Sequence, residues 1–179
     1  MQKDTVEVVA YNPNWPSLYA AERTRIVAGS PPYFVMLEHI GSTAVPGLRA
    51  KPIIDMMAAV PSLVGSGPLS DALNGLGYAV FETGMSNRLF LRRYTPDERF
   101  HLHIVEYATW YERKERHMRD YLLEHPDAAR AYGELKDGLA RLHAEDSLAY
   151  TRAKTAFIQG VIDKVQDARG LPRFDVWED

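Results

Sequence analysis

Residues 39–57 read HIGSTAVPGLRAKPIIDMM, and this stretch decides both the predicted fold and the predicted site. Apolar runs at 35–40 and 53–60 predict two strands, joined by a loop that contains a Gly-Ser turn and two prolines. The second run contains one carboxylate, Asp55. An ionised carboxylate in a buried strand costs several kcal/mol unless it is compensated. We therefore expect Asp55 to bind a cation or to join a hydrogen-bond network.

The remaining patterns predict an α+β fold. The predicted strands are 6–10, 35–40, 53–60, 78–82, 88–94 and 99–106, and the predicted helices are 15–28, a short one after Ser66, 109–124, 126–143 and 148–168. Short turns between the last three strands favour antiparallel pairing there. Asn14 is expected to cap the first helix, and Thr109 with Glu112 the third. The order predicts an α+β core over 1–108, with C-terminal helices over 109–179 packed on it as one structural unit.

The composition is that of an ordinary globular domain. The 179 residues are 46% hydrophobic and 25% charged, with a net charge of −3, so nothing favours binding to duplex nucleic acid or to an anionic membrane surface. The absence of cysteine excludes disulfides and thiolate metal sites, and it fits a cytoplasmic protein. No apolar run approaches the ~20 residues that span a bilayer. We expect a cytoplasmic protein with neither a membrane nor duplex nucleic acid as its partner.

The turn at Gly41 and Ser42 is a candidate phosphate site. A glycine at the end of a strand lets backbone N–H groups converge, and the hydroxyls of Ser42 and Thr43 add donors for phosphate oxygens. The alternative is a plain tight turn. Cationic side chains that could also contact phosphate are Lys51, Arg88, Arg92 and Lys154. Each of them could instead be a solvated side chain of the surface.

Two histidines form a second candidate site. The period-2 alternation of a strand at 99–106 puts His101 and His103 on one face. Two imidazoles in this arrangement are a recurrent source of adjacent metal ligands. Asp55, His101 and His103 are therefore candidate ligands of one metal, with His39 as a further candidate. A structural alternative pairs Asp55 with an arginine.

Further motifs extend over nearly the whole chain. They are YNPNW at 11–15, EHIGST at 38–43, KPIID at 51–55, HLH at 101–103 with Glu106, RDYL at 119–122 with His125-Pro126, and Tyr150 with Lys154, Phe157 and Ile158. Together they resemble the GrpB (UPF0157) family, which belongs to the nucleotidyltransferase fold superfamily. The block from 38 to 55 is the most specific part of the resemblance, and the helical motifs add support.

The resemblance implies a nucleotidyltransferase-like mixed β-sheet flanked by helices, with a helical C-terminal part. In that superfamily a Gly-Ser turn, here Gly41 and Ser42, holds the triphosphate of a nucleotide. Carboxylates on nearby strands hold two Mg²⁺ ions, which orient an acceptor hydroxyl and stabilise in-line displacement at the α-phosphorus. Asp55 matches the first of these carboxylates and is the expected catalytic residue.

The chain departs from this pattern at the second carboxylate position, which is Met57. A thioether is a weak ligand for a hard cation such as Mg²⁺. His101 and His103 stand where the third carboxylate is expected. The sequence leaves three alternatives: a nucleotidyltransferase-like enzyme that uses Mg²⁺ or Mn²⁺ and an unknown acceptor, a protein that binds a nucleotide or another phosphorylated small molecule without catalysis, and a site for Zn²⁺ or Mn²⁺.

Overall fold

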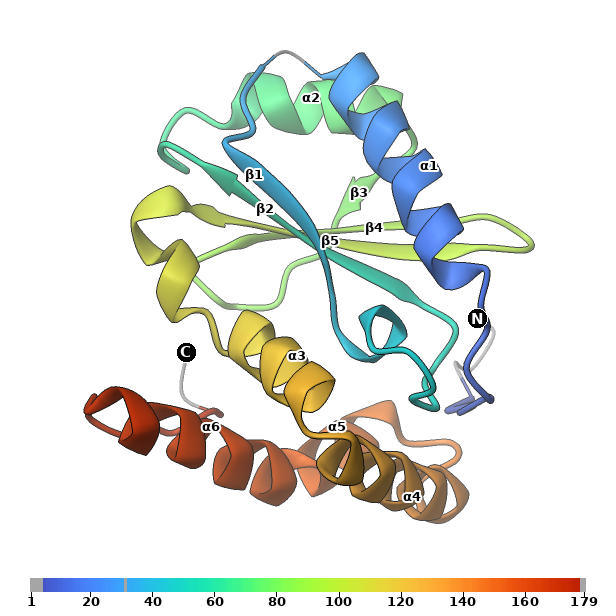
Figure 1. Cartoon of the computed structure of the whole chain (residues 1–179). Helices are drawn as coiled ribbons and strands as arrows, with labels where there is room; N and C mark the ends of the chain where they lie inside the picture. The colour runs from blue at the N-terminus through green and yellow to red at the C-terminus, as the bar shows by residue number, and fades with distance from the viewer. Residues whose placement is uncertain (1–4, 31, 178–179) are drawn as a thin grey trace.

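The structure of the chain is a computed structural model that describes residues 5–30 and 32–177. A five-stranded sheet in the order β1-β2-β5-β4-β3 forms its centre (Figure 1). The strands are β1 (Met36–Ile40), β2 (Ile54–Val60), β3 (Ala79–Val80), β4 (Leu89–Tyr94) and β5 (Arg99–Glu106). The β2–β5 pair is parallel and the other pairs are antiparallel. This confirms the α+β class and the antiparallel pairing predicted for the last three strands.

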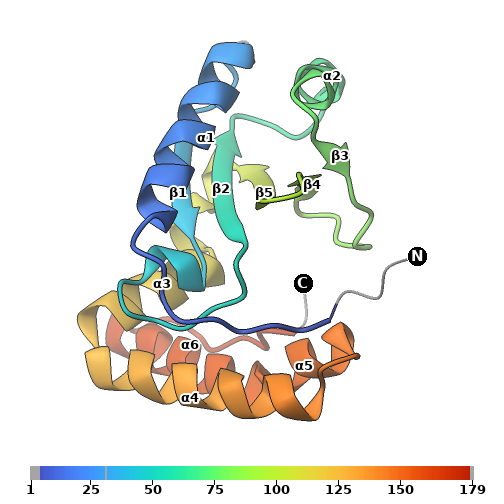
Figure 2. The ribbon, with the colours of Figure 1, turned by 90° about the vertical axis from the view of Figure 1, so that its right-hand side faces the viewer.

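Helices cover both faces of the sheet. They are α1 (Trp15–Gly29), α2 (Gly67–Gly75), α3 (Lys114–Glu124), α4 (Pro126–Leu142), α5 (Ser147–Ala153) and α6 (Thr155–Arg169). Figures 1 and 2 show α1 and α2 on one side of the sheet, and α3 on the other side with α4 to α6 beyond it. No helix in the described part of the chain is both long and apolar enough to cross a membrane.

The alternation of side chains along the strands divides the core in two. Met56 of β2 and Leu102 of β5 belong to the larger apolar cluster, which includes side chains of α1 and α2. Met57 of β2 and Val105 of β5, which point to the opposite face, belong to a smaller cluster that includes Trp110. The smaller cluster covers only part of its face, and polar side chains occupy the rest of the central strands there.

The strand predicted at 6–10 is wrong. Val9 makes a single isolated bridge, in which its backbone N–H and C=O both bond to Ala50. Val6 instead donates its N–H to the carbonyl of Ala144, in the turn between α4 and α5. The segment therefore crosses from the helices toward the loop after β1 and does not run along an edge of the sheet. Residues 1–4 and 178–179, the ends of the two predicted parts of the chain, lie outside the described residues.

Neither of the two predicted side-chain caps forms, although Asn14 is the N-cap residue of α1 as expected. The Thr109 hydroxyl donates to the carbonyl of Glu106 and accepts hydrogen bonds from the Arg113 guanidinium, so it is not used to cap a helix. A 3₁₀ helix spans this segment up to Glu112, and α3 begins after it. Asn14 makes no side-chain cap at the start of α1.

The helix predicted at 148–168 is interrupted at Lys154. This residue ends α5 and precedes α6, and its N–H bonds to the carbonyl of Thr151, three residues back, which tightens the last turn of α5. The predicted end at Gly170 is confirmed, with a left-handed φ of 65°. The interruption places the Lys154 side chain at a helix junction, and this position matters for the site.

Candidate functional site

The register of the sheet brings the Gly-Ser turn and the lone carboxylate together. Asp55 on β2 lies opposite Ile40, the last residue of β1, and next to His101 on β5. The chain then turns at Gly41, whose φ is 71° and whose Cα lies so close to Asp55 that an added Cβ would be 2.8 Å from Oδ2. Only glycine fits this position without strain. The turn and the carboxylate are therefore in direct contact.

Asp55 is part of a short hydrogen-bonded chain. Its Oδ1 lies 3.1 Å from Nδ1 of His101, and Nε2 of His101 lies 2.9 Å from the Tyr94 hydroxyl. The carboxylate can only accept, so Nδ1 donates to it and Nε2 accepts from Tyr94. Burial alone would raise the pKa of the Asp55 carboxyl, but the hydrogen bond from His101 and the nearby imidazoles hold this pKa below its usual range. The lowered pKa keeps the carboxylate ionised near pH 7, and the side chain is 30% exposed, so a ligand can reach it.

His103 lies on the same face as His101 but does not join Asp55. Its Nδ1 is 3.4 Å from a nitrogen of the Arg88 guanidinium, and its ring packs against Phe90 at 4.5 Å between centroids. Burial lowers the pKa of His103 to about 4, so the ring is neutral near pH 7. Arg88 forms a 2.6 Å ion pair with Glu115 of α3. A phosphate group at Arg88 would therefore have to compete with the Glu115 carboxylate, which already binds this guanidinium.

His39 and Thr43 lie behind the turn. His39 pairs with Met56 in the register and stacks on Tyr19 of α1, so it faces away from Asp55 and its neighbours on the sheet. Nε2 of His39 is 2.9 Å from the Thr43 hydroxyl, which in turn donates to the carbonyl of Ile53 at 3.1 Å. Thr43 is fully buried. Both side chains brace the turn, and the hydroxyl proton of Thr43 is already used.

The described side chains do not form a resident metal centre. Within residues 5–30 and 32–177, no group of three or more His, Asp or Glu side chains is placed to hold a metal ion. Met57, at the expected second carboxylate position, is fully buried among apolar side chains. Asp55 and His101 form a pair, while His103 is bound to Arg88 and His39 lies on the other face. The protein's own donors therefore do not fit the expected two-metal site.

Lys136 of α4 reaches the turn and was missed from the sequence. Its Nζ donates to the Ser42 hydroxyl at 2.8 Å and to the backbone carbonyl of Arg49. The residue is only 2% exposed. Burial, with a contribution from the charge of Lys154, lowers the pKa of Lys136 to about 7. One feature of the sequence could have indicated this burial: Lys136 follows Tyr132 by four residues, so it lies on the apolar face of the predicted helix.

Two more lysines, Lys51 and Lys154, lie in the same region as Lys136. Nζ of Lys154 lies 4.4 Å from the centre of the Tyr150 ring, and Nζ of Lys51 lies 6.0 Å from the same ring. Burial and the charge of Lys51 lower the pKa of Lys154 to about 8, although Asp55 acts in the opposite direction. In the described part of the chain, neither Lys154 nor Lys136 forms an ion pair with a carboxylate. We call Lys51, Lys136 and Lys154 the lysine cluster.

An ion network fixes the strand that leads into the turn. Arg119 of α3 donates to Glu38 on β1 at 2.7 Å and to the backbone carbonyl of His39 at 2.9 Å. Arg116, one turn earlier on α3, also contacts Glu38, at 3.2 Å. These bonds anchor the end of β1 to α3 and hold the Gly-Ser turn between the sheet and the C-terminal helices. Sequence reasoning did not identify these three charged residues as supports of the site.

Arg92 ends the row of polar side chains across the sheet. It lies beside His101 in the register, on the side away from Asp55. Its guanidinium carbon is 3.4 Å from the centre of the Phe81 ring. The structure therefore gathers Gly41, Ser42, Asp55 and the lysine cluster, adds His101, and places Arg92 two strands away from Asp55.

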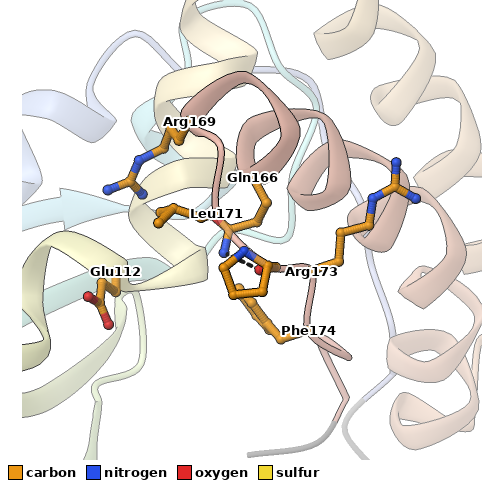
Figure 3. Close-up of a pocket in the computed structure, with 7 residues that line it drawn as sticks. Glu112, Gln166, Arg169, Leu171, Arg173 and Phe174 are labelled. Atoms are coloured by element: carbon orange, nitrogen blue, oxygen red, sulfur yellow. Dashed lines mark hydrogen bonds between the residues drawn. The ribbon is translucent and has the colours of Figure 1, made fainter.

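Two pockets lie elsewhere on the molecule. One, of about 460 Å³, lies between the loop at 45–48 and the start of α4. The other, of about 320 Å³, lies where the chain leaves α6 (Figure 3). In the second pocket, Gln166 donates to the carbonyl of Pro172. Arg173, which also lines this pocket, pairs with Asp167 of α6. These contacts hold the end of the chain on α6.

Comparison with known proteins gives a consistent family match. The sequence model described as "GrpB protein" matches residues 5–164. A UPF0157 protein of Pseudomonas aeruginosa is 36% identical, over 94% of this chain and 71% of that protein. The UPF0157 protein YqkA of Bacillus subtilis is 32% identical, over 88% of this chain and 46% of that protein. The chain thus spans less than half the length of the Bacillus relative.

A solved structure has the same fold. The crystal structure of the conserved protein GrpB from Enterococcus faecalis is 32% identical to this chain, with a TM-score of 0.82. The match covers 92% of this chain and 99% of that chain. The arrangement of the sheet and the C-terminal helices is therefore shared with a solved relative.

Proposed function

The chain belongs to the GrpB family, and from that premise we propose that it binds the phosphate groups of a nucleotide, or of another phosphorylated small molecule, at Gly41 and Ser42. The family name specifies no reaction, so the proposal rests on the site. The nucleotidyltransferase-like fold and a cytoplasmic location are part of the same proposal.

The lysine cluster is the observation that carries the proposal. Three ammonium groups, supplied by a loop, by α4 and by the α5–α6 junction, lie near one another, and that of Lys136 donates to Ser42 at the turn. Burial, and to a lesser extent repulsion within the cluster, lowers the pKa of Lys136 and of Lys154. Two buried ammonium groups as close as those of Lys136 and Lys154 are unfavourable without an anion, because like charges repel more strongly where water is excluded. A phosphate group would neutralise this repulsion and restore the charge of the lysines.

The turn supplies the geometry that a phosphate needs. Gly41 has no side chain, so a ligand can approach its backbone closely. Lys136 donates to the Ser42 oxygen, which leaves the hydroxyl proton of Ser42 to point to another acceptor. A phosphate oxygen at the turn would accept this proton and receive Lys154 from the opposite side.

Calorimetric titration with inorganic tripolyphosphate and with ATP tests the proposal. We expect both to bind the wild type, and we expect Lys154→Met to weaken binding roughly tenfold, equivalent to about 1.4 kcal/mol. Lys164→Met is the matched control, because Lys164 is exposed on α6 and should leave the affinity unchanged. The absence of binding of both ligands to the wild type would show that the proposal is wrong.

Asp55 is the proposed catalytic residue if a nucleotidyl group is transferred. Mg²⁺ is commonly bound by one or two carboxylates together with the phosphates of the substrate. We propose that Mg²⁺ or Mn²⁺ comes to the site with the nucleotide and that Asp55 is its protein ligand; the acceptor is unknown. Asp55→Asn should abolish nucleotide turnover and keep metal-free binding of tripolyphosphate. Turnover that persists in this variant would exclude Asp55 as the catalytic residue.

A binding function without catalysis is the second candidate. It is favoured by Met57, which replaces the second carboxylate with a buried thioether. Titrations with and without Mg²⁺ separate the two candidates. Tight binding that does not depend on metal, together with no turnover of any nucleoside triphosphate, supports the second. A gain in affinity on adding Mg²⁺ that disappears in Asp55→Asn, while metal-free binding remains, supports the first.

A further inference from the structure

Arg88, just before β4, and the two arginines of β4 differ in how their charge is balanced. Arg88 pairs with Glu115 at 2.6 Å, and Arg93 approaches Glu22 at 3.5 Å. Arg92 forms no ion pair within residues 5–30 and 32–177, and its buried Nε has no hydrogen-bond partner there. A half-buried guanidinium without an anion is unfavourable, because its N–H groups lose water and gain no acceptor.

Aromatic rings hold Arg92 in place. Its guanidinium carbon lies 3.4 Å from the centre of the Phe81 ring and 5.2 Å from that of Phe90. A guanidinium stacked on a ring keeps its N–H groups in its own plane, where they can bind the two oxygens of a carboxylate or phosphate. The rings therefore fix the orientation of the cation without consuming its donors.

The position of Arg92 connects it to the rest of the site. β2, β5 and β4 are neighbours in the sheet, so Asp55, His101 and Arg92 form one row on the same face. Neighbouring strands are about 4.8 Å apart, so the backbones of Asp55 and Arg92 are roughly 10 Å apart. Tyr94, two residues further along β4, places its hydroxyl on His101 in the same row. A small molecule can span this distance.

We propose that Arg92 and Tyr94 form a second anion-binding subsite, which takes the carboxylate or phosphate group of a small second ligand. The Arg92 guanidinium binds two oxygens of that group, and the Tyr94 hydroxyl donates to the ligand when it leaves His101. The idea that this second ligand is the acceptor of a nucleotidyl group rests on the proposed function. As a site for an oxyanion, the subsite rests only on the geometry of β4.

The subsite is separate from the phosphate turn. The lysine cluster belongs to the loop after β1 and to the C-terminal helices, whereas Arg92 lies on β4 and is held by Phe81, just after β3. In the row across the sheet, Asp55 and His101 separate the two anion sites. A ligand at the turn and a ligand at Arg92 would therefore meet at Asp55.

Nuclear magnetic resonance of the arginine Nε–H groups tests the subsite, with succinate and inorganic phosphate as probes. We expect the Arg92 signal, assigned by its loss in Arg92→Met, to shift saturably with either probe. Arg88 is the internal control, because Glu115 already binds it at 2.6 Å, and its signal should stay in place. An Arg92 signal that does not move with either probe overturns the proposal.

Saturation transfer from the protein to succinate gives a second readout. We expect it to fall roughly tenfold in Arg92→Met, whose side chain can still pack on Phe81, and to be unchanged in Arg141→Met on the exposed face of α4. Transfer that is unchanged in Arg92→Met overturns the proposal. If Arg92→Met does not fold, Arg92→Lys assigns the Arg92 signal of the wild type instead, and that signal then decides.

Lys154→Met separates this subsite from the proposed function. We expect this variant to bind tripolyphosphate more weakly and to keep the response of Arg92 to succinate. A wild type that does not bind tripolyphosphate contradicts the proposed function and leaves the subsite standing. An Arg92 signal that ignores both probes in a protein that binds tripolyphosphate contradicts the subsite alone.

Discussion

Gly41 lies against the carboxylate of Asp55, so that a Cβ at Gly41 would be 2.8 Å from Oδ2 and 3.1 Å from Cβ of Asp55. The contact exists because β1 and β2 pair antiparallel with Ile40 opposite Asp55. The loop between β1 and β2 therefore begins directly beside the Asp55 side chain. This single contact places the Gly-Ser turn, the proposed phosphate site, beside the one acidic group of β2.

Gly41→Ala should destabilise the protein by roughly 1–3 kcal/mol, because its φ of 71° disfavours any side chain and the added carbon meets Asp55. Chemical denaturation measures the loss. Gly160→Ala is the matched control, since nothing lies within 4 Å of a Cβ added there in the middle of α6. This control should be neutral or stabilise by about 0.5–1 kcal/mol. Equal stabilities of the two variants would contradict the contact.

The buried Lys136 should make stability depend on pH. Its pKa is about 7 in the folded protein and 10.5 as the ordinary value, so the unfolded chain binds more protons between these two pH values. The stability of the wild type relative to Lys136→Met should therefore rise as the pH increases from about 7 toward 10.5. Denaturation at several pH values measures the difference. A difference that stays constant over this window would contradict the low pKa.

Tripolyphosphate should weaken this pH dependence of stability if it binds at the lysine cluster. An anion favours the charged ammonium and raises the pKa of Lys136, so the folded protein takes up protons on binding. Calorimetry near pH 8 in buffers of different ionisation enthalpy should therefore detect proton uptake. Lys136→Met should take up fewer protons, because the titrating group is gone. Equal uptake by the two proteins would count against binding near Lys136.

His103 should contribute to the loss of stability in acid. Its pKa is 6.5 as the ordinary value and about 4 in the folded protein, so the unfolded chain binds the additional proton in this range. The contribution is present above pH 6.5 and is lost as the pH falls toward 4. His103→Asn should therefore show a smaller loss of stability over this window. A variant with the same dependence as the wild type would mean that His103 titrates normally.

Arg119→Ala should cost roughly 1–3 kcal/mol, because it removes the 2.7 Å donor of Glu38, which keeps only Arg116 at 3.2 Å, and the side-chain donor to the carbonyl of His39. Its side chain is only 13% exposed. Arg130→Ala is the control, since Arg130 is 66% exposed and its partner Asp127 is 94% exposed, and it should change stability by less than about 0.5 kcal/mol. Thermal unfolding compares the two variants. A similar small effect of both would show that Arg119 does not brace β1.

Local patterns were sufficient to predict most of the elements. The apolar runs around Asp55 and the alternation at 99–106 predicted β2 and β5 to within one residue. The strand at 6–10 was wrong because an apolar run indicates burial but does not specify a strand partner. Here Val9 exchanges backbone hydrogen bonds with Ala50 and Val6 bonds to Ala144, and among the described residues the segment pairs with no strand of the sheet. The Thr109 cap was wrong because the same hydroxyl found other partners.

The sequence by itself determined which residues could carry chemistry: the glycine at the turn, the lone carboxylate and the histidine pair on one face of a strand. These follow from periodicity and backbone conformation, which depend on near neighbours. Only the tertiary structure decided which of them meet. Lys136 reaches Ser42 across 94 residues of chain, Glu115 occupies Arg88, His39 turns to α1, and Arg92 keeps its charge unbalanced among the described residues. The partner of a charged side chain depends on contacts between distant segments, and no local pattern encodes those contacts.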